Sequence, residues 1–394
     1  MYILYESEVN EDISRLDKAW PEPPTFIFMP DRSAVSREWV EKGMARFPDS
    51  FQENHFVLLT SGSTGMPKLV IGSRKRAEDL ASVIHNVQDS EPVIQTVLAL
   101  PLSYCYAFVN QWLWSRVEKR ALISVGGFNR PDNLKEALLA AQDCMICLIG
   151  AQVPLFVSHY GDDTSFPGVI RVHFAGGPFP QQSIHIVKRF FPNAKIFNNY
   201  GCAEAMPRLT IRPLEDSDEG SNIGKPLPGI ELRTGEAGEI LFRSPYRAVG
   251  FYDHDGLRIP SDEDWVPSGD LGEEIDNHYW RIRGRSNEVF KRYGEKISLP
   301  QLMNTVCARW SGQAAFYRDK DPSGEEGHVL ILTPEPTKEQ VQNILQAFRK
   351  NHPRTHWPLR LESTPAFPLL PSGKIDKAGL AKIKNATVHW RQRL

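Results

Sequence analysis

The sequence has few cysteines, no long apolar run and almost no net charge, and each absence narrows the range of functions. No stretch approaches the roughly 18 to 20 consecutive apolar residues that a membrane-spanning helix requires. The N-terminus lacks a charged region followed by a long apolar stretch and a cleavage signal, which argues against secretion. The formal charge of -2 provides no basic field for nucleic acid or an anionic membrane surface. We therefore expect a cytoplasmic protein that binds neither and grips anionic ligands locally.

The cysteines argue against a disulfide framework, because there are only five of them, an odd number: Cys105, Cys144, Cys147, Cys202 and Cys307. Two of them have the CxxC spacing of redox and metal sites. They lie in the short apolar run 144–149, which predicts a buried strand, and no second CxxC supports a zinc site. We expect the pair to serve packing.

The apolar pattern predicts an α/β fold in more than one domain, since 394 residues with 41% hydrophobic content suffice for large cores. Short apolar runs alternate with helical patterns, which indicates layered sheets with largely parallel strands. After residue 226, short runs broken by Gly and Pro predict a small β-barrel-like part or a twisted sheet. From residue 284 onward the pattern predicts a separate α+β domain. The expected strands are 56–60, 97–100, 121–125, 144–149, 196–199, 314–317 and 329–332, and the expected helices are 131–142, 180–191, 300–310 and 338–350.

A loop rich in glycine and hydroxyl residues follows the first of these strands. Its sequence is Thr60-Ser61-Gly62-Ser63-Thr64-Gly65-Met66-Pro67-Lys68. Glycines expose backbone N–H donors, hydroxyls add further donors and the lysine adds a positive charge, so the loop is suited to wrap phosphates. The spacing fits neither the Walker A pattern nor the dinucleotide-binding fingerprint. For a generic cluster of this kind, a plain surface loop would be the alternative.

The loop resembles the phosphate-binding loop of the adenylate-forming superfamily, which includes acyl-CoA synthetases, nonribosomal-peptide adenylation domains and firefly luciferase. Two further strings resemble motifs of that superfamily in the same order. The segment Asn199-Tyr200-Gly201-Cys202-Ala203-Glu204 is similar to its YGxTE motif, which implies that Tyr200 stacks on adenine and Glu204 holds Mg²⁺. The threonine of that motif is Ala203 here. Ala175-Gly176-Gly177 resembles the glycine pair that lines the adenine and acyl pockets; a tight turn after a strand is the alternative.

Three more segments extend the resemblance toward the C-terminus. Ser268-Gly269-Asp270 implies that Asp270 binds the ribose hydroxyls, and Gly284-Arg285-Ser286-Asn287 implies that Arg285 touches the nucleotide. The hinge aspartate of the superfamily is Asn287 here, so its charge is lost. Gly294 would lie beside a pantetheine arm, although Pro300-Gln301 replaces the acidic pair that usually follows. The segment Pro371-Ser372-Gly373-Lys374-Ile375-Asp376 implies that Lys374 enters the active site for adenylation.

The resemblance implies an N-terminal adenylate-forming domain over 1–283, a hinge at 284–288 and a mobile C-terminal lid over 289–394. Only 59 residues precede Thr60, whereas relatives commonly have a much longer segment there. We therefore expect an N-terminal region shortened at its start. A homodimer is one hypothesis for how the surfaces that this region would cover are buried.

The implied reaction is the ATP-dependent and Mg²⁺-dependent activation of a carboxylic acid to an acyl-adenylate, followed by thioester formation with CoA. Lys374, Glu204 and Thr60 would be catalytic, while Ser61–Gly65 and Lys68 would hold phosphates. A carrier-protein phosphopantetheine is an alternative acceptor, and a non-catalytic nucleotide-binding protein is a further alternative. The nucleotide-binding and CoA-binding residues implied are Ser61, Gly62, Ser63, Thr64, Gly65, Lys68, Gly176, Gly177, Asn199, Tyr200, Asp270, Arg285 and Gly294.

The acyl pocket is expected to draw on Tyr104, Tyr106, Ala151, Ala175 and Gly176, with the two tyrosines flanking an aryl or short acyl group. Relatives that activate amino acids carry an aspartate near the first of these positions. No aspartate occurs over 101–120, which disfavours an α-amino acid. Arg208 would pair with a second substrate carboxylate or lie in a surface ion pair, and we favour the surface pair.

Overall fold

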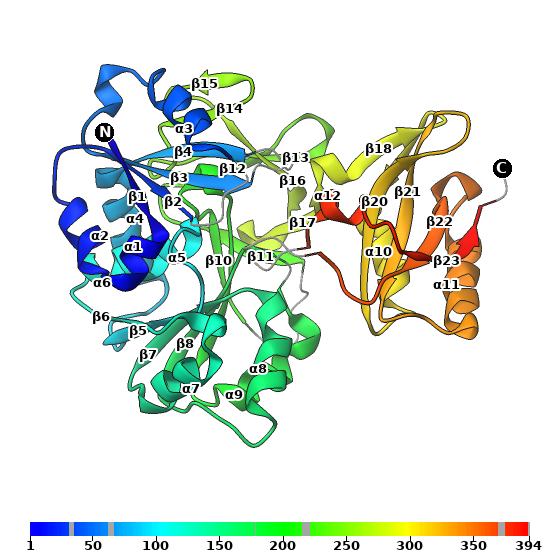
Figure 1. The fold of residues 1–394 in the computed structure, drawn as a ribbon, viewed down its shortest axis with the longest axis horizontal. Helices are drawn as coiled ribbons and strands as arrows, with labels where there is room; N and C mark the ends of the chain where they lie inside the picture. The colour runs from blue at the N-terminus through cyan, green and yellow to red at the C-terminus, as the bar shows by residue number, and fades with distance from the viewer. Residues whose placement is uncertain (31–34, 62–66, 178, 215–220, 369–374, 393–394) are drawn as a thin grey trace. The chain divides into compact units, whose positions relative to one another are not determined.

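A computed structural model describes residues 1–30, 35–61, 67–177, 179–214, 221–368 and 375–392. Contacts within the chain divide it into two compact units (Figure 1). The first comprises Met1–Ser268 with Gly272–Ile282, and the second comprises Gly269–Leu271 with Arg283–Leu394. Both units combine helices with sheets, which confirms the predicted mixed α/β fold. Within the described ranges, no helix is both long and apolar enough to cross a bilayer.

The smaller sheet of the first unit begins with parallel strands and then becomes antiparallel. Strands β1, β2 and β3 run parallel, and β3 and β4 form an antiparallel pair. The strand predicted at 56–60 is β3. In sheet order the strands are β1 (Tyr2–Tyr5), β2 (Phe26–Met29), β3 (His55–Ser61), β4 (Pro67–Ser73), β14 (Gly250–Asp253) and β15 (Gly256–Arg258).

The larger sheet contains the predicted parallel core, because β6, β5, β7, β8 and β9 all pair in parallel. The strands predicted at 97–100, 121–125, 144–149 and 196–199 are confirmed as members of this core. In sheet order the strands are β12 (Glu231–Thr234), β13 (Glu239–Arg243), β16 (Val266–Glu274), β17 (Trp280–Arg285), β11 (Asn222–Pro226), β10 (Thr210–Pro213), β9 (Lys195–Tyr200), β8 (Val169–Phe174), β7 (Cys144–Leu148), β5 (Gln95–Leu98) and β6 (Ala121–Ser124).

The β-barrel-like part expected after residue 226 is not observed, because the described residues form no closed barrel. Strands β11, β12, β13, β16 and β17 instead extend the larger sheet beyond β10, and the hairpin of β14 and β15 extends the smaller one. An open sheet edge presents unpaired backbone N–H and C=O groups, so short strands can add to it without closing on themselves. The short-strand pattern therefore predicts β structure correctly, but the barrel-like element is wrong.

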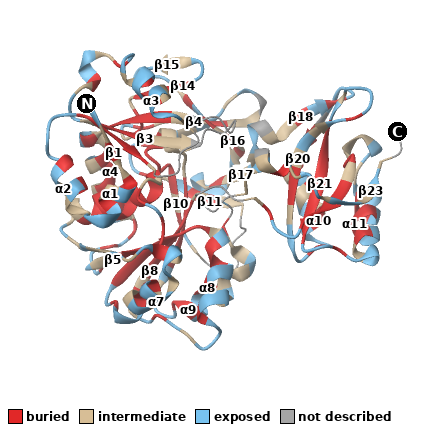
Figure 2. Ribbon diagram, in the orientation of Figure 1, coloured by how far each residue is buried: buried red, intermediate tan, exposed pale blue. Residues whose placement is uncertain are grey.

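Helices between and outside the two sheets complete the layers of the first unit. One apolar cluster joins residues of both sheets to α4 and to the helical stretch from α5 to α6, with the rings of Phe56 and Phe108 stacked at 5.2 Å. A second cluster lies under α7, α8 and α9, and a third under α3. Buried strands run through the centre of the unit (Figure 2). The helices are α1 (Glu6–Glu11), α2 (Ser14–Ala19), α3 (Arg37–Met44), α4 (Arg74–Val87), α5 (Cys105–Ala107), the π-helical η2 (Phe108–Leu113), α6 (Trp114–Val117), α7 (Pro131–Ala140), α8 (Val153–Tyr160) and α9 (Ile184–Phe190).

Strand β7 carries the CxxC pair, and all five of its residues are buried. Cys144 and Cys147 are both free thiols within this strand. Burial raises the pKa of each thiol to about 12, so neither forms a thiolate near neutral pH. The packing role predicted for the pair is confirmed.

The second unit is built on a four-stranded sheet and a separate two-stranded hairpin. Its core joins the sheet to α10 and α11. Helix α11 begins after Thr337, whose hydroxyl accepts a hydrogen bond from the backbone N–H of Gln340, a good N-terminal cap. The strands predicted at 314–317 and 329–332 are β20 and β21, and the helices predicted at 300–310 and 338–350 are α10 and α11. The elements of this region are β18 (Val289–Arg292), β19 (Glu295–Ser298), α10 (Leu299–Cys307), β20 (Gln313–Lys320), β21 (Glu326–Thr333), α11 (Lys338–Asn351), β22 (Arg360–Ser363), α12 (Lys377–Leu380) and β23 (Thr387–Arg391).

Candidate active site

The two ends of the glycine-rich loop meet across the hairpin of β3 and β4. Thr60 and Lys68 are direct partners in the antiparallel register, and Ser61 is the last residue of β3. The loop residues Gly62, Ser63, Thr64 and Gly65 lie outside the described residues. The hairpin therefore fixes where this loop leaves and re-enters the smaller sheet.

Lys68 and Glu204 form an ion pair at the base of this loop. The Lys68 ammonium lies 2.7 Å from the Glu204 carboxylate and 5.7 Å from the centre of the Phe251 ring. Glu204 sits in a short 3-10 turn four residues after β9, and its backbone carbonyl accepts a hydrogen bond from Ala248. The sequence predicted both side chains but not their contact, which joins positions 136 residues apart.

The pair is accessible enough to meet a ligand, since the Lys68 and Glu204 side chains are 15% and 20% exposed. Mg²⁺ is usually held by one or two carboxylates together with phosphate oxygens of a substrate. A single, partly exposed carboxylate beside a lysine has that chemistry. The residues present therefore fit a magnesium-bound nucleotide.

Three of the predicted acyl-pocket residues belong to one apolar cluster. Tyr104 and Tyr106 meet edge to face with ring centres 6.5 Å apart, and Ala175 packs with them. Ala151 is exposed in the short 3-10 turn Gly150–Gln152 and lies outside this buried cluster. The remaining members of the cluster are Leu100, Ala107, Cys147 and Ile149.

Gly176 lies against this tyrosine-containing cluster. Its φ is +74°, a left-handed conformation that favours glycine, and a Cβ at this position would lie 2.0 Å from the Tyr104 hydroxyl. The next residue, Gly177, is exposed, and no described atom lies within 4 Å of where its Cβ would be. Gly176 thus lets the Tyr104 hydroxyl lie close to the backbone, and Gly177 leaves open space beside the chain.

A buried polar network contacts Tyr106, and the sequence did not predict this network. Arg208 is completely buried and donates hydrogen bonds of 2.6 Å to the side-chain oxygens of Asn110 and Asn199. The Asn199 amide in turn donates to the Tyr106 hydroxyl at 3.1 Å. Because Arg208 has no exposed surface and binds no described carboxylate, the surface ion pair that we favoured for it is wrong. Asn199 and Tyr106 are the members of this network that the sequence indicates as site residues.

Burial sets the charge states of this network. It lowers the pKa of Arg208 to about 10, so the guanidinium keeps its charge at neutral pH. It also lowers the pKa of the buried His173 well below its usual value, with a further contribution from the Arg208 charge, so that ring stays neutral. Asn110 lies within the π-helical segment η2, a geometry that is frequent at functional sites. The apolar sequence around Asn110 gave no signal that its side chain would receive a charge.

Tyr200 is the last residue of β9 in the first unit, and the second unit holds the other predicted site residues. The Arg285 guanidinium lies 3.0 Å from the Asp270 carboxylate, and the Ser286 hydroxyl donates to the backbone carbonyl of Gly269 at 3.0 Å. Asn287 lies in the short 3-10 turn Ser286–Glu288. Glu288 in the same turn forms an ion pair with Lys377 at the start of α12. Gly294 occupies the turn between β18 and β19, and Lys374 lies outside the described residues.

Comparisons with known proteins agree on one family. The family model described as AMP-binding enzyme matches residues 3–252. The D-alanine–D-alanyl carrier protein ligase of Streptococcus pneumoniae (strain ATCC 700669 / Spain 23F-1) is 25% identical over 382 residues, which covers 84% of this chain and 71% of that protein. The 2-succinylbenzoate–CoA ligase of Salmonella typhimurium is 24% identical over 363 residues, covering 91% and 74% respectively.

Solved structures show the same fold at lower identity. The o-succinylbenzoate CoA synthetase of Bacillus subtilis, in complex with its acyl-adenylate intermediate, aligns with a TM-score of 0.73 and 15% identity, covering all of this chain and 89% of that one. An anthranilate CoA ligase in complex with anthranoyl-AMP aligns with a TM-score of 0.68 and 16% identity, covering 96% and 77%.

Proposed function

Because the chain belongs to the family of AMP-binding enzymes, we propose that it activates a carboxylic acid with ATP as an acyl-adenylate and then transfers the acyl group to the thiol of CoA. The observation that carries the proposal is the partly exposed Lys68–Glu204 pair at the base of the glycine-rich hairpin. It offers an ammonium for phosphate oxygens and a carboxylate for a phosphate-bound metal ion at one place.

Adenylation joins two anions, since a carboxylate oxygen attacks the α-phosphorus while pyrophosphate leaves. The barrier arises largely from bringing like charges together in line, so positioning and electrostatic stabilisation should dominate over general-base chemistry. Thr60, Lys68 and the loop between them would hold the phosphates, and Glu204 would hold Mg²⁺, which neutralises phosphate charge when bound. Lys374 would bridge the carboxylate and the α-phosphate, as the resemblance implies.

The acyl pocket favours a compact substrate. Tyr104 and Tyr106 meet edge to face, and Gly176 lies against the Tyr104 hydroxyl, so this region suits an aryl or short acyl group. The absence of aspartate over 101–120 disfavours an α-amino acid. The buried Arg208 is held by two amide oxygens and keeps Asn199 in place beside the proposed adenine-binding Tyr200.

Thioester formation would follow at the same site. The thiol sulfur bonds to the acyl carbon, the bond from that carbon to the phosphate oxygen breaks, the thiol proton passes to solvent and AMP leaves. In the proposed arrangement, residues 1–283 form the catalytic body, and the lid over 289–394 turns about the hinge at 284–288 to bring Gly294 to the adenylate. Asp270 and Arg285, paired at 3.0 Å, would contact the nucleotide.

A screen for pyrophosphate release over aryl, short-chain and dicarboxylic acids, with ATP and Mg²⁺, tests the first half-reaction. Mass spectrometry of the products with either CoA or a phosphopantetheine-bearing carrier protein then separates the two acceptors. Of the curated relatives, the S. pneumoniae protein is named for a carrier-protein acceptor and the S. typhimurium protein for CoA, so both acceptors belong in the assay. No pyrophosphate release with any acid would favour the non-catalytic alternative.

The role proposed for Lys374 gives a sharper test. Lys374→Ala should slow adenylate formation by about 10² to 10³-fold, the usual effect of removing one stabilising group for transition-state charge. Thiolysis of supplied acyl-adenylate should change little, because that step does not need the lysine. Lys382→Ala, at an exposed lysine of the same region, is the control. Equal losses in both half-reactions would contradict the assignment.

A further inference from the structure

The turn that carries Gly294 is an unusual one for its sequence. It joins β18 to β19 through only Tyr293 and Gly294, whose φ angles are +48° and +81°. A two-residue hairpin with both φ values positive is a type I′ turn, which favours Asn-Gly because side chains beyond asparagine are strained there. Tyrosine is therefore unfavourable at the first position, and because the residue is 55% exposed, core packing does not explain its presence there.

The strained tyrosine is fixed by two carboxylates of the loop between β20 and β21. Its hydroxyl donates to Asp321 at 2.8 Å, and its backbone N–H donates to Glu325 at 2.7 Å. Asp321 is held in turn by the hydroxyl of Ser323 at 2.5 Å and by the backbone N–H of Glu325 at 3.1 Å. The tyrosine side chain and backbone are thus both tied to one rigid loop.

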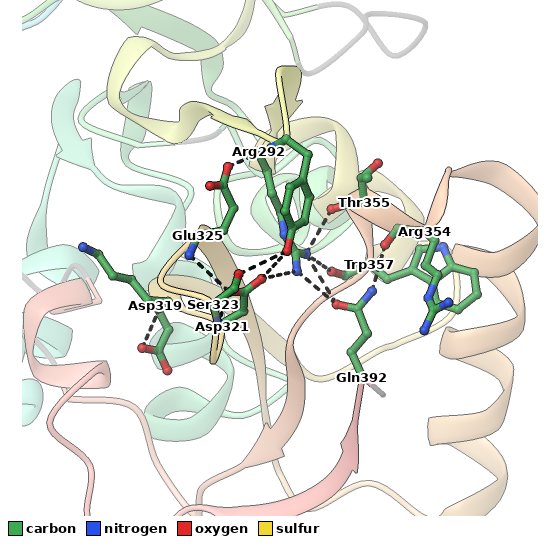
Figure 3. Close-up of polar contacts among 11 residues, drawn as sticks. Arg292, Asp319, Asp321, Ser323, Glu325, Arg354, Thr355, Trp357 and Gln392 are labelled. Carbon is green, nitrogen blue, oxygen red and sulfur yellow. Dashed lines mark hydrogen bonds and ion pairs between the residues drawn. The ribbon is translucent and has the colours of Figure 1, made fainter. Parts of the chain in front are cut away.

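The residue before the turn is tied to the same carboxylate from inside the unit. The side chains of Arg292 and Asp321 are 1% and 0% exposed, and their charged groups lie 3.3 Å apart. The Arg292 guanidinium also donates to the backbone carbonyl of Thr355 at 3.1 Å and to the Gln392 side chain at 3.4 Å (Figure 3). A buried ion pair with these additional partners does not exchange with solvent, so it holds the end of β18 in one position.

Beside this fixed frame, Gly294 faces open space. No described atom lies within 4 Å of the position that a Cβ would occupy on Gly294. The glycine is required by its backbone angle and not by a neighbour that fills its place. A rigid turn with an exposed aromatic ring and an uncovered glycine is suited to line the path of a thin, flexible chain.

We propose that Arg292, Asp321 and Tyr293 are positioning residues for the second half-reaction, which hold the Gly294 turn in the geometry that the thiol acceptor requires. This inference rests on the proposed function. Among the described residues, the hydrogen bonds and ion pair of this network are all made within the second unit, and none involves a residue that we assign to phosphate binding. Weakening it should impair thiolysis of the acyl-adenylate and spare adenylate formation.

Tyr293→Phe is the first test, because it removes only the hydroxyl that binds Asp321. Loss of a hydrogen bond to a charged group should reduce the thiolysis rate of supplied acyl-adenylate about tenfold, with pyrophosphate release unchanged. The loss should persist in single-turnover measurements at saturating CoA, because a displaced turn slows the thiolysis step itself and does not only weaken the binding of CoA. Tyr317→Phe is the matched control, since the Tyr317 hydroxyl donates to Glu362 at the same 2.8 Å elsewhere in the same unit.

Tyr293→Asn separates positioning from simple turn stability. Asn-Gly is the preferred sequence of a type I′ turn, so this variant should keep the hairpin while losing the bond to Asp321. We expect the slow thiolysis of Tyr293→Phe to persist in Tyr293→Asn. Thiolysis at the wild-type rate in both variants, or equal losses in both half-reactions, would overturn the proposal. A wild-type protein that releases no pyrophosphate would instead refute the proposed function itself.

Discussion

Replacing His328 by phenylalanine should remove an acid sensitivity from the second unit. The ring of His328 lies in β21, is completely buried and meets the rings of Phe316 and Phe290 edge to face at 5.1 Å and 6.0 Å. Neither of its nitrogens has a hydrogen-bond partner among the residues that the structure describes. Burial in these apolar surroundings, with smaller contributions from nearby cations such as Arg292, lowers the pKa of His328 to about 3.

The sign and size of the effect follow from proton binding. In the unfolded chain the His328 ring titrates near its ordinary pKa of about 6.5. Between that value and about 3, the unfolded state binds a proton that the folded state excludes, so the free energy of unfolding falls as the pH is lowered. Each pH unit costs about 1.4 kcal/mol, which amounts to about 2 kcal/mol at pH 5. Above pH 6.5 this stability is fully present.

His328→Phe should therefore lose less stability between pH 7.5 and pH 5 than the wild type, by about 2 kcal/mol. It should also be at least as stable at pH 7.5, because two unsatisfied buried nitrogens are removed. The measurement is hydrogen exchange of the full chain, followed by mass spectrometry of peptides from β20 and β21 and corrected for intrinsic exchange rates at each pH.

Two comparisons make this experiment decisive. His278→Gln, at a position whose side chain is 86% exposed, controls for the loss of a histidine as such and should leave the protection of the β20 and β21 peptides as it is in the wild type. Asp321 also has a lowered pKa, chiefly because the Ser323 hydroxyl donates to it, but its contribution is lost only below the ordinary carboxyl range. It therefore does not confuse the comparison at pH 5. Parallel losses of protection in wild type and His328→Phe would refute the reasoning.

Two further predictions concern the proposed active site. Gly176→Ala would place a Cβ 2.0 Å from the Tyr104 hydroxyl at a φ of +74°, so we expect kcat/KM for the acid to fall at least about tenfold, measured by pyrophosphate release at saturating ATP. Glu204→Gln keeps an oxygen that accepts from Lys68 but loses the charge, so adenylation should slow about 10² to 10³-fold and need more Mg²⁺ for half-maximal rate; an unchanged Mg²⁺ titration would show that Glu204 is not a metal ligand.

The sequence predicted the elements of the fold better than their arrangement. Apolar runs such as 144–149 and 196–199 became β7 and β9, because fully buried parallel strands have a strong local signature. The sequence did not predict that β3 belongs to a second sheet. That sheet joins β3 and β4 to β2 near the N-terminus and to β14 far along the chain, and such pairings have no local signature. The barrel-like prediction was wrong for the same reason, because short strands have the same local sequence pattern whether they close into a barrel or extend the edge of a sheet.

Site residues divide in the same way. Lys68 and Glu204 were found because each lies in a distinctive local string, and their contact then follows from the fold. Arg208 lies in no such string. Its burial depends on Asn110 and Asn199, which reach it from η2 and β9, so sequence alone favoured the common surface role of arginine.

The Lys68–Glu204 and Arg292–Asp321 ion pairs differ in exposure, and this difference matches what each half-reaction would demand. Lys68 and Glu204 are 15% and 20% exposed, so on the proposed mechanism a phosphate can take over the ammonium and a metal ion the carboxylate without leaving either charge buried alone. Arg292 and Asp321 are 1% and 0% exposed, and parting them would strand two charges in the core. On this mechanism, contacts to phosphate and metal replace the Lys68–Glu204 contact in each catalytic cycle, whereas the Arg292–Asp321 contact stays intact throughout. An exchangeable pair suits the binding of ATP, and a fixed pair suits a turn that must present one geometry to the acceptor thiol.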